Sequence, residues 1–371
     1  MKPAGGGDSS LHAVSTGRNG ATSSTAGVEV ISPSRLHFGL LSFGQRGGRQ
    51  YGGVGVMVEQ PALCVAIRPA GASGHVRATG QSHSICWGDH PLGEVVASPA
   101  ATPELQGRIA DFVQRWSRYQ GFPAVAGLRQ FEIRLNSAPT PHCGLGAGTQ
   151  LGLAVGAGLN AFFGLPQPGP SELAESVGRG LRSAVGTYGF FQGGLIVERG
   201  KRPGEKIAPL DCRLKLPDAW RAVLIQPSTC CGLSGAAEQR AFDDLPPVPA
   251  EVSRKLWEEI RLRMLPAARR GEFRAFGESV YRYGRQAGLC FAPLQGGPYN
   301  GPHLERLVRQ MRAWGVGAVG QSSWGPTLFA FVPTPAAAEQ LRQRLLASSD
   351  QPAQILITRC NNLGAQIHSL E

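Results

Sequence analysis

Three glycines at alternate positions, Gly144, Gly146 and Gly148, form the sequence feature with the clearest chemical use. They follow FEIRLNSA (131–138), whose alternating pattern predicts a strand, and they precede an apolar stretch that predicts a helix over 149–163. Glycines let the backbone approach a bound group closely, and the N–H groups and dipole of a helix N-terminus attract an anion. We therefore expect a backbone site for phosphate groups at this loop.

The same stretch has other interpretations. No Asp, Glu, Lys or Arg occurs from Leu135 to Ser171, which is long enough for a membrane helix. Its polar side chains and many glycines disfavour insertion, and the sequence shows no second span, so we expect no membrane segment. A buried helix explains residues 149–163 but leaves the glycine loop unexplained. The Rossmann pattern, with an acid about 20 residues on, and the Walker pattern, with Gly-Lys-Ser/Thr, do not fit.

Two further segments carry side chains that bind anions. SPSRLHFGLL (32–41) contains Arg35 and His37, and LRSAVGTYGFFQGG (181–194) contains Arg182. A guanidinium group binds phosphate or carboxylate through paired hydrogen bonds, and an imidazole can orient an oxygen. Taken singly, an arginine beside a strand is more often a surface charge, and a lone histidine among apolar residues is more often packed in the core. Only the motifs in which they stand make these residues candidates.

Strand and helix patterns alternate along the rest of the chain. Strands are predicted at 28–34, 54–60, 63–69, 131–138, 193–200, 220–228 and 354–359, and a glycine-rich turn region follows the first of them. Helices are predicted at about 103–119, 149–163, 171–181, 249–268, 269–288 and 335–347. The alternation predicts a two-lobed α/β (α+β) fold with mixed sheets and flanking helices. We expect a disordered tail over 1–26 and two domains, 27–210 and 211–371.

Charge and cysteine content narrow the function further. The formal net charge is +11, and only five of the 37 Lys and Arg residues are lysines. The arginines are scattered and no nucleic-acid-binding motif accompanies them, so we expect no nucleic-acid partner. Eight widely spaced cysteines without a C-x-x-C pair, and no signal peptide, predict reduced thiols and a cytoplasmic protein.

Three motifs resemble those of the GHMP small-molecule kinase superfamily. PTPHCGLGAGTQLGLAVG is similar to its phosphate loop, SPSRLHFGLL to its first motif, and GQSSWGPTLFAF (320–331) to its third. SRLHFGLL, YGGVGVMVEQP, GLGAGTQL, GLSGAAEQRAF and GQSSWGPT together resemble one branch, the beta-ribofuranosylaminobenzene 5'-phosphate synthases. The likeness runs from about Val28 to the C-terminus.

The resemblance implies a synthase rather than a kinase. It implies that phosphoribosyl pyrophosphate is joined to 4-aminobenzoate or 4-hydroxybenzoate in methanopterin biosynthesis, releasing carbon dioxide and pyrophosphate, with Mg²⁺ as cofactor and a homodimer as the assembly. The implied catalytic residues are Arg35, His37 and Arg182. Pyrophosphate would lie on Gly144, Leu145, Gly146, Ala147, Gly148, Thr149 and Gln150. Substrate would contact Ser34, Gly53, Gly55, Gln321, Ser322, Ser323 and Trp324.

A GHMP-type kinase using ATP is the alternative, and a non-catalytic or nucleic-acid-binding descendant is a third. Many kinases of the superfamily place an aspartate ahead of a Gly-Gly strand as the base for the acceptor hydroxyl. Gly186 resembles that position here, and no acid lies between Glu175 and Glu198. The chain also lacks the strand-ending acid pair with which ordinary phosphoribosyltransferases hold ribose, because Asp243 and Asp244 stand before the proline-rich PPVP. The sequence therefore disfavours a kinase but does not show how ribose is held.

Overall fold

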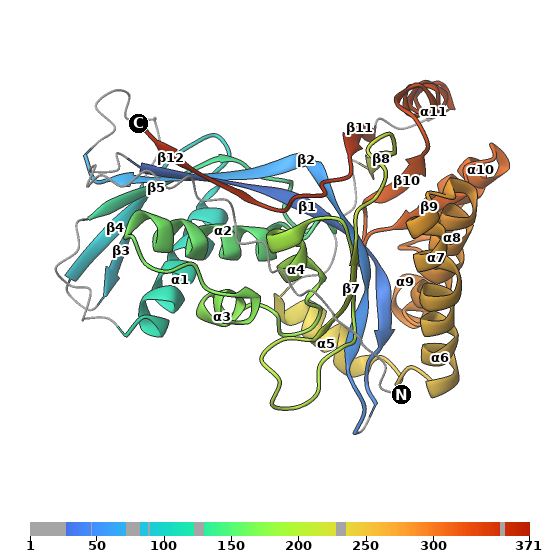
Figure 1. The fold of residues 1–371 in the computed structure, drawn as a ribbon, viewed down its shortest axis with the longest axis horizontal. Helices are drawn as coiled ribbons and strands as arrows, with labels where there is room; N and C mark the ends of the chain where they lie inside the picture. The colour runs from blue at the N-terminus through green and yellow to red at the C-terminus, as the bar shows by residue number, and fades with distance from the viewer. Residues whose placement is uncertain are drawn as a thin grey trace, which may run out of the picture.

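The computed structural model describes residues 27–45, 47–71, 82–87, 90–121, 130–227, 235–348 and 353–371. Two sheets and their helices make the two lobes of Figure 1, with one lobe on each side of a pair of long strands. The predicted α/β class with mixed sheets and flanking helices is confirmed. The predicted tail, 1–26, lies outside the described residues.

Strands β1 (Gly27–Ser42) and β2 (Tyr51–Pro69) run along the lobe on the left of Figure 1 and then bend down between the two lobes. The sequence patterns predicted a turn after residue 34 and two separate strands over 54–69, but both segments are continuous strands. The register between them shifts between His37 and Gly39, and such a bulge bends a strand and redirects its side chains. Gly39 takes a φ of 142° there, which only glycine adopts without strain. The bulge sets the direction of the His37 side chain.

The larger sheet has the strand order β12-β1-β2-β5-β4-β3, and β6 and β7 extend it from β2. Its remaining strands are β3 (His83–Trp87), β4 (His90–Val96), β5 (Phe131–Ser137), β6 (Leu195–Glu198), β7 (Leu210–Leu214) and β12 (Gln366–Leu370). Both β7 and β12, which lie at or beyond the predicted boundary at 210, pair with strands of this sheet. The division into 27–210 and 211–371 stays a prediction.

The smaller sheet is antiparallel, with the order β11-β8-β10-β9. Its strands are β8 (Arg221–Pro227), β9 (Ala318–Gln321), β10 (Leu328–Val332) and β11 (Ala353–Arg359). The helices beside it are α5 (Gly235–Asp244), α6 (Ala250–Glu259), α7 (Leu265–Arg270), α8 (Phe273–Leu289), α9 (Ala292–Gln295), α10 (Pro302–Ala313) and α11 (Pro335–Ser348). A π-helical turn, η1 (Ile260–Met264), joins α6 to α7 just before Pro266. A shared aromatic core that includes Phe38, Phe276 and Phe329 joins α8 and this sheet to β1.

The uncharged stretch that resembles a membrane segment by length is a core helix. It forms α2 (Ala147–Phe162), which packs between α1 (Pro103–Tyr119) and the larger sheet, and both predicted helices are confirmed. A methyl group at Gly152 would lie 3.0 Å from the Phe112 ring, and one at Gly158 would lie 2.9 Å from Ile67. The small residues of α2 therefore serve close packing. Within the described part of the chain, none of the helices combines the length and apolar character needed to cross a bilayer.

The helix predicted over 171–181 is shorter than expected. It forms α3 (Pro170–Ser176) and stops there, because Gly178 and Gly180 take positive φ values of 64° and 75°. The chain then runs as a loop to α4 (Val185–Gln192). This α3–α4 loop, residues 177–184, carries Arg179 and Arg182 to the functional site.

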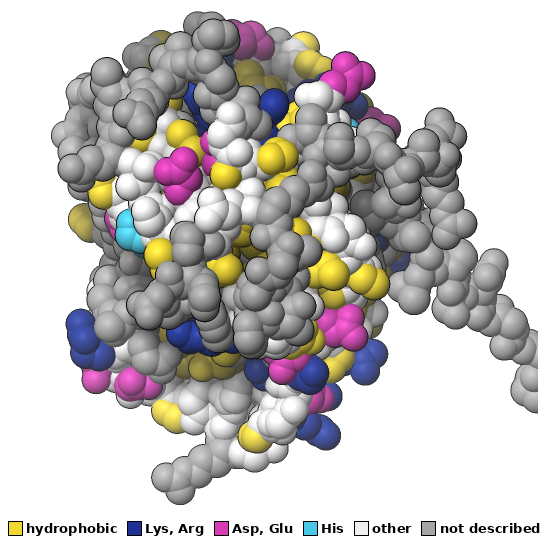
Figure 2. Space-filling model, turned by 90° about the vertical axis from the view of Figure 1, so that its left-hand side faces the viewer, with side chains coloured by type: hydrophobic (Ala, Val, Ile, Leu, Met, Phe, Trp, Pro, Cys, Tyr) yellow, Lys and Arg dark blue, Asp and Glu magenta, His cyan; other side chains and the backbone are white. Residues whose placement is uncertain are grey.

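Acidic and basic side chains mix on the surface. Figure 2 views the end of the molecule that carries β3, β4 and α1, and the described Lys and Arg side chains there lie beside Asp and Glu. Several of the exposed arginines are bonded to carboxylates, as Arg115 is to Asp111 at 2.8 Å. Such neutralised arginines do not favour a nucleic-acid partner.

Candidate active site

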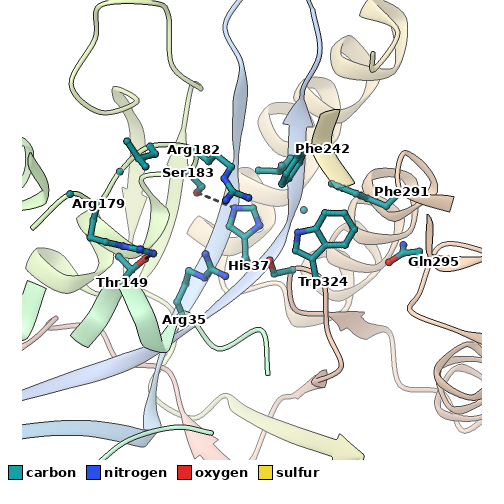
Figure 3. A pocket seen from close by; sticks show the side chains of 16 residues that line it. Arg35, His37, Thr149, Arg179, Arg182, Ser183, Phe242, Phe291, Gln295 and Trp324 are labelled. Atoms are coloured by element: carbon teal, nitrogen blue, oxygen red, sulfur yellow. Dashed lines mark hydrogen bonds between the residues drawn. The ribbon is translucent and has the colours of Figure 1, made fainter. Parts of the chain in front are cut away.

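One pocket of about 180 Å³ lies where the two lobes meet, beside the bulge of β1. Its walls come from β1, the first turn of α2, the α3–α4 loop, α5, α9 and the segment after β9 (Figure 3). The sequence predictions Arg35, His37, Thr149, Arg182, Ser323 and Trp324 all line it. The other lining residues are Gly39, Leu40, Gly178, Arg179, Gly180, Leu181, Ser183, Phe242, Phe291 and Gln295. Among these described lining residues none is Asp or Glu.

Hydrogen bonds lock the three sequence motifs together behind this pocket. The buried Ser322 hydroxyl donates to the Gly144 carbonyl at 2.7 Å and accepts the His37 backbone N–H at 3.0 Å. The Ser323 N–H donates to the His37 carbonyl at 2.9 Å, and the Arg35 N–H donates to the Leu145 carbonyl at 2.9 Å. Ser322 therefore positions the glycine loop and β1 and does not itself reach the pocket.

The first turn of α2 is surrounded by arginines from three other elements. Gly146 is the N-cap residue, in a left-handed conformation with a φ of 74°, and a methyl group there would lie 3.1 Å from Arg35 Cβ. A methyl group at Gly148 would collide with the guanidinium group of Arg108, which comes from α1. Arg179 Nη2 donates to the Thr149 hydroxyl at 3.0 Å. Three guanidinium groups thus add to the partial positive charge of the helix N-terminus.

Two N–H groups of the predicted backbone cradle form hydrogen bonds within the helix. The N–H groups of Thr149 and Gln150 both donate to the Gly146 carbonyl, at 3.0 and 3.1 Å. The N–H groups of Ala147 and Gly148 are at the helix start, where no intrahelical acceptor exists, so they can meet an anion. Thr149 reaches the pocket through its side chain instead.

His37 is a buried, neutral imidazole at the centre of Figure 3. Burial, with the nearby charge of Arg35, holds its pKa well below the ordinary value of 6.5. Its Nε2 lies 3.1 Å from the Ser183 hydroxyl, and the Ser183 hydroxyl is in turn bonded to the Glu198 carboxylate. Gly53 makes room for the ring, because a methyl group there would lie 3.1 Å from His37 Nε2.

An aromatic wall closes the opposite side of the pocket. Trp324 meets Phe291 edge-on with ring centroids 4.7 Å apart, and it meets Phe242 with centroids 5.4 Å apart. The Arg182 guanidinium group lies over the Phe242 ring, 4.9 Å from its centroid. This is cation–π distance, so the wall holds Arg182 in place. The pocket can therefore take a flat apolar group beside an anion.

Several predicted substrate residues lie behind the pocket rather than in it. Ser34 donates its hydroxyl to the Pro61 carbonyl at 2.7 Å, and Gln150 bonds to the Ser32 hydroxyl and the Gly186 carbonyl. Gln321 accepts the Asn300 N–H at 2.7 Å. Gly55 permits close strand contact, because a methyl group there would collide with the Leu36 carbonyl. These residues, with Gly53 and Ser322, hold the site in shape.

The sequence analysis missed Arg108, Arg179, Glu198, Phe242 and Phe291. The arginines had no motif around them, and the two phenylalanines reach the pocket only through tertiary packing. Glu198 did carry a signal, since it is the one charged residue in LIVE, a strand that is buried at every position. No group of three His, Cys, Asp or Glu side chains that could hold a metal ion occurs among the described residues.

Comparisons with known proteins place the chain beside one group of enzymes. Residues 264–350 match the C-terminal region of the GHMP kinases. The chain is 28% identical over 316 residues to the beta-ribofuranosylphenol 5'-phosphate synthase of Methanothermobacter thermautotrophicus, covering 81% of this chain and 88% of that protein. It is 27% identical to the synthase of the same name from Archaeoglobus fulgidus, covering 92% of this chain and 99% of that protein. The chain is a homologue of these synthases. The resemblance to this branch of the GHMP superfamily is therefore confirmed.

Solved structures with the same fold include kinases and a decarboxylase. Homoserine kinase from Cytophaga hutchinsonii superposes with a TM-score of 0.60 at 13% identity, covering 95% of this chain and all of that one. Mevalonate diphosphate decarboxylase from Enterococcus faecalis gives 0.58 at 10% identity, covering 93% and 99%. At such identities the likeness to these structures establishes the fold alone.

Proposed function

We propose that the protein is a decarboxylating C-riboside synthase that joins phosphoribosyl pyrophosphate to 4-hydroxybenzoate or 4-aminobenzoate. One observation carries the proposal: a single pocket combines Arg35, Arg179 and Arg182 with an aromatic wall, and no Asp or Glu is among its described lining residues. Such a site suits a substrate with several anionic groups and a flat ring. The names of the homologous synthases point to the same reaction class.

The two ends of the pocket would bind different parts of the reactants. Arg35, Arg108 and Arg179, with the first N–H groups of α2, would hold pyrophosphate. Arg182, which lies over Phe242, would bind the benzoate carboxylate while the ring lies against Trp324. This arrangement places the ring between the aromatic wall and the ribose.

Bond changes at the ribose follow from this placement. The bond from the anomeric carbon to pyrophosphate breaks, and the arginines stabilise the negative charge that develops on the leaving group. The ring carbon that bears the carboxylate attacks the anomeric carbon, and carbon dioxide then leaves. The aromatic wall keeps water away from the electron-poor ribosyl centre. Mg²⁺ would enter bound to the pyrophosphate group of phosphoribosyl pyrophosphate, since the described residues offer no cluster of acids to hold it.

A kinase fits the pocket less well. Transfer of phosphate to an alcohol benefits from a carboxylate base in contact with the substrate. Gly186 stands where the resemblance would place that acid, and its carbonyl accepts a hydrogen bond from Gln150 Nε2 at 2.9 Å. Glu198, the buried acid nearby, lies behind Ser183 and does not line the pocket.

Release of labelled carbon dioxide tests the proposal. Purified protein is incubated with phosphoribosyl pyrophosphate, Mg²⁺ and either carboxyl-labelled benzoate, and we expect equal amounts of labelled carbon dioxide and pyrophosphate. Arg35→Gln should lose this activity, whereas Arg309→Gln, a matched change at an exposed arginine of α10, should keep it. Product without loss of label, or ATP-dependent phosphorylation with no label released from either acid, would overturn the proposal.

The predicted homodimer and cytoplasmic location stay predictions. Size-exclusion chromatography with light scattering is the direct measurement of the assembly. A mass equal to one chain would contradict the dimer, whose subunit mass is 39.2 kDa.

A further inference from the structure

Glu198 is an acid buried beside the pocket for which the reaction described above has no use. It ends β6 with no solvent exposure, and its carboxylate accepts the Gly200 N–H at 2.7 Å and the Ala184 N–H at 3.4 Å. Burial raises its pKa from 4.5 to about 7, against the effect of these hydrogen bonds and that of the Ser183 hydroxyl. A buried acid that titrates near neutrality is costly unless it has a role.

The hydrogen-bond directions around Ser183 fix the tautomer of His37. An ionised carboxylate only accepts, so the single hydroxyl proton of Ser183 goes to Glu198. The Ser183 oxygen then accepts, from the Val185 N–H at 3.2 Å and from His37 Nε2 at 3.1 Å. Nε2 of the neutral ring therefore carries the proton, and Nδ1 is left as the acceptor. The order carboxylate, hydroxyl, imidazole leads from the core to the pocket (Figure 3 shows its last step).

We propose that Glu198, Ser183 and His37 form a hydrogen-bonded chain, called the relay below, in which His37 takes the phenolic proton of a 4-hydroxybenzoate substrate during ring attack and returns it when carbon dioxide leaves. The relay rests on the proposed function and extends it, because it selects between the two benzoates. His37 is the catalytic residue, since it lines the pocket. Ser183 orients His37 Nε2, and Glu198 is a positioning residue that acts through Ser183.

The proton balance follows the bonds. As the ring carbon bonds to the anomeric carbon, the phenol O–H bond breaks and an N–H bond forms at His37 Nδ1, which leaves a dienone that still carries the carboxylate. The bond to the carboxylate then breaks, carbon dioxide leaves, and its electron pair restores the ring as a phenolate. The phenolate takes the proton back from His37, so no proton is gained or lost overall.

4-Aminobenzoate does not need this relay. Its nitrogen donates its lone pair to the ring without losing a proton, and loss of carbon dioxide restores the neutral amine. A phenol donates far more strongly once its proton has been removed. The relay therefore accelerates the hydroxy substrate and has little effect on the amino substrate.

Surrounding charges adjust the relay. Arg35 and Arg182 face His37 in the pocket, while Arg49, from the β1–β2 connection, lowers the pKa of Glu198. Burial and the charge of Glu198 raise the pKa values of Tyr188 on α4 and Tyr283 on α8. Arg49 is bonded to Glu205 at 2.8 Å, which weakens its effect on Glu198. A phosphate group bound at Arg35 offsets the charge that lowers the pKa of His37, so substrate binding makes the imidazole a better proton acceptor.

The test compares the two benzoates in the same variants. We expect Glu198→Gln to lower kcat with 4-hydroxybenzoate by about tenfold or more and to change kcat with 4-aminobenzoate by less than about threefold. With the hydroxy substrate, the wild-type rate should rise through about pH 7 as Glu198 ionises, and the variant should lose this rise. Ser183→Ala should behave like Glu198→Gln. Ser183→Thr keeps the hydroxyl and should therefore keep the wild-type ratio of kcat with 4-hydroxybenzoate to kcat with 4-aminobenzoate.

Glu259→Gln is the matched control, because it also replaces a buried carboxylate, but one on α6 outside the pocket. Equal losses with both benzoates, or an unchanged ratio in Ser183→Ala, would overturn the relay while leaving the synthase intact. If the wild type releases carbon dioxide from neither acid, the proposed function fails and the relay fails with it.

Discussion

Two of the buried glutamates, Glu198 and Glu259, have opposite surroundings. Glu259, at the end of α6, is bonded to Arg282 at 2.8 Å and to Arg263 at 3.0 Å. Burial alone would raise its pKa, but the hydrogen bonds from Arg282 and Ser279 outweigh burial and lower it. Glu198 receives hydrogen bonds from two backbone N–H groups and a serine hydroxyl, and its pKa rises to about 7. An ion pair fixes a charge, whereas neutral donors leave an acid able to exchange its proton near neutral pH.

The pH dependence of stability should separate the two acids most clearly. Glu198 binds a proton more tightly in the folded chain, so its contribution to stability is full below pH 4.5 and is lost as pH rises to about 7. The free energy of unfolding of the wild type, relative to Glu198→Gln, should therefore fall by about 3 kcal/mol between these values. Urea denaturation at a series of pH values measures it.

Glu259 should show the opposite sign. Its lowered pKa stabilises the folded chain above pH 4.5, and that contribution is lost as pH falls through the folded value. Relative to Glu259→Gln, the wild type should therefore gain stability as pH rises from the acid side. If the free energy of unfolding of the wild type, relative to each variant, changed with pH in the same direction for both, the contrast between the two acids would be wrong.

The next largest difference should be in kcat/KM, between an arginine of the pocket and an arginine bonded to Glu259. Arg179→Gln removes a guanidinium group from the first turn of α2, and we expect kcat/KM for phosphoribosyl pyrophosphate to fall by about 100-fold. Arg282→Gln removes a partner of Glu259 and should change kcat/KM by less than about twofold, with its effect seen in thermal stability instead. Comparable kinetic losses in both would show that the pocket arginines are structural.

Ser322→Ala should have the smallest effect, a loss of stability where the glycine loop meets β1 behind the pocket. It removes the hydrogen bonds to the Gly144 carbonyl and from the His37 N–H, at about 1–2 kcal/mol of stability in total. Ser322→Thr keeps the hydroxyl and serves as the control. An unchanged free energy of unfolding in Ser322→Ala would mean that packing and the backbone hydrogen bond from Arg35 to Leu145 hold the glycine loop and β1 together without the Ser322 hydroxyl.

Contiguous motifs allowed part of the site to be predicted. Arg35 and His37 share one short segment, and the glycine loop predicted the N-terminus of α2. Arg108 and Arg179 could not be found in the same way, because each reaches that helix from an element distant in sequence. The glycine loop contains no charged side chain. The positive charge around it comes from arginines of neighbouring elements, and only the tertiary structure shows which arginines these are.

The fold was predicted unevenly for similar reasons. Periodic helices such as α1 were placed to the residue, because one face of the helix is consistently apolar. The long strands β1 and β2 were broken up in the prediction, because glycines and Pro61 inside a strand look locally like turns. The strand β12 was not predicted, since its burial pattern is mostly exposed and its pairing with β1 is a long-range contact.

The pairing of β12 with β1 has a consequence for folding during synthesis on the ribosome. Residues 27–31 of β1 form their ladder with residues 366–370, so one edge of the larger sheet stays open until the chain has been synthesised as far as residue 370. An open strand edge can pair with the edge of another chain. In the nascent larger lobe, one side of β1 therefore stays uncovered until β12 has emerged from the ribosome.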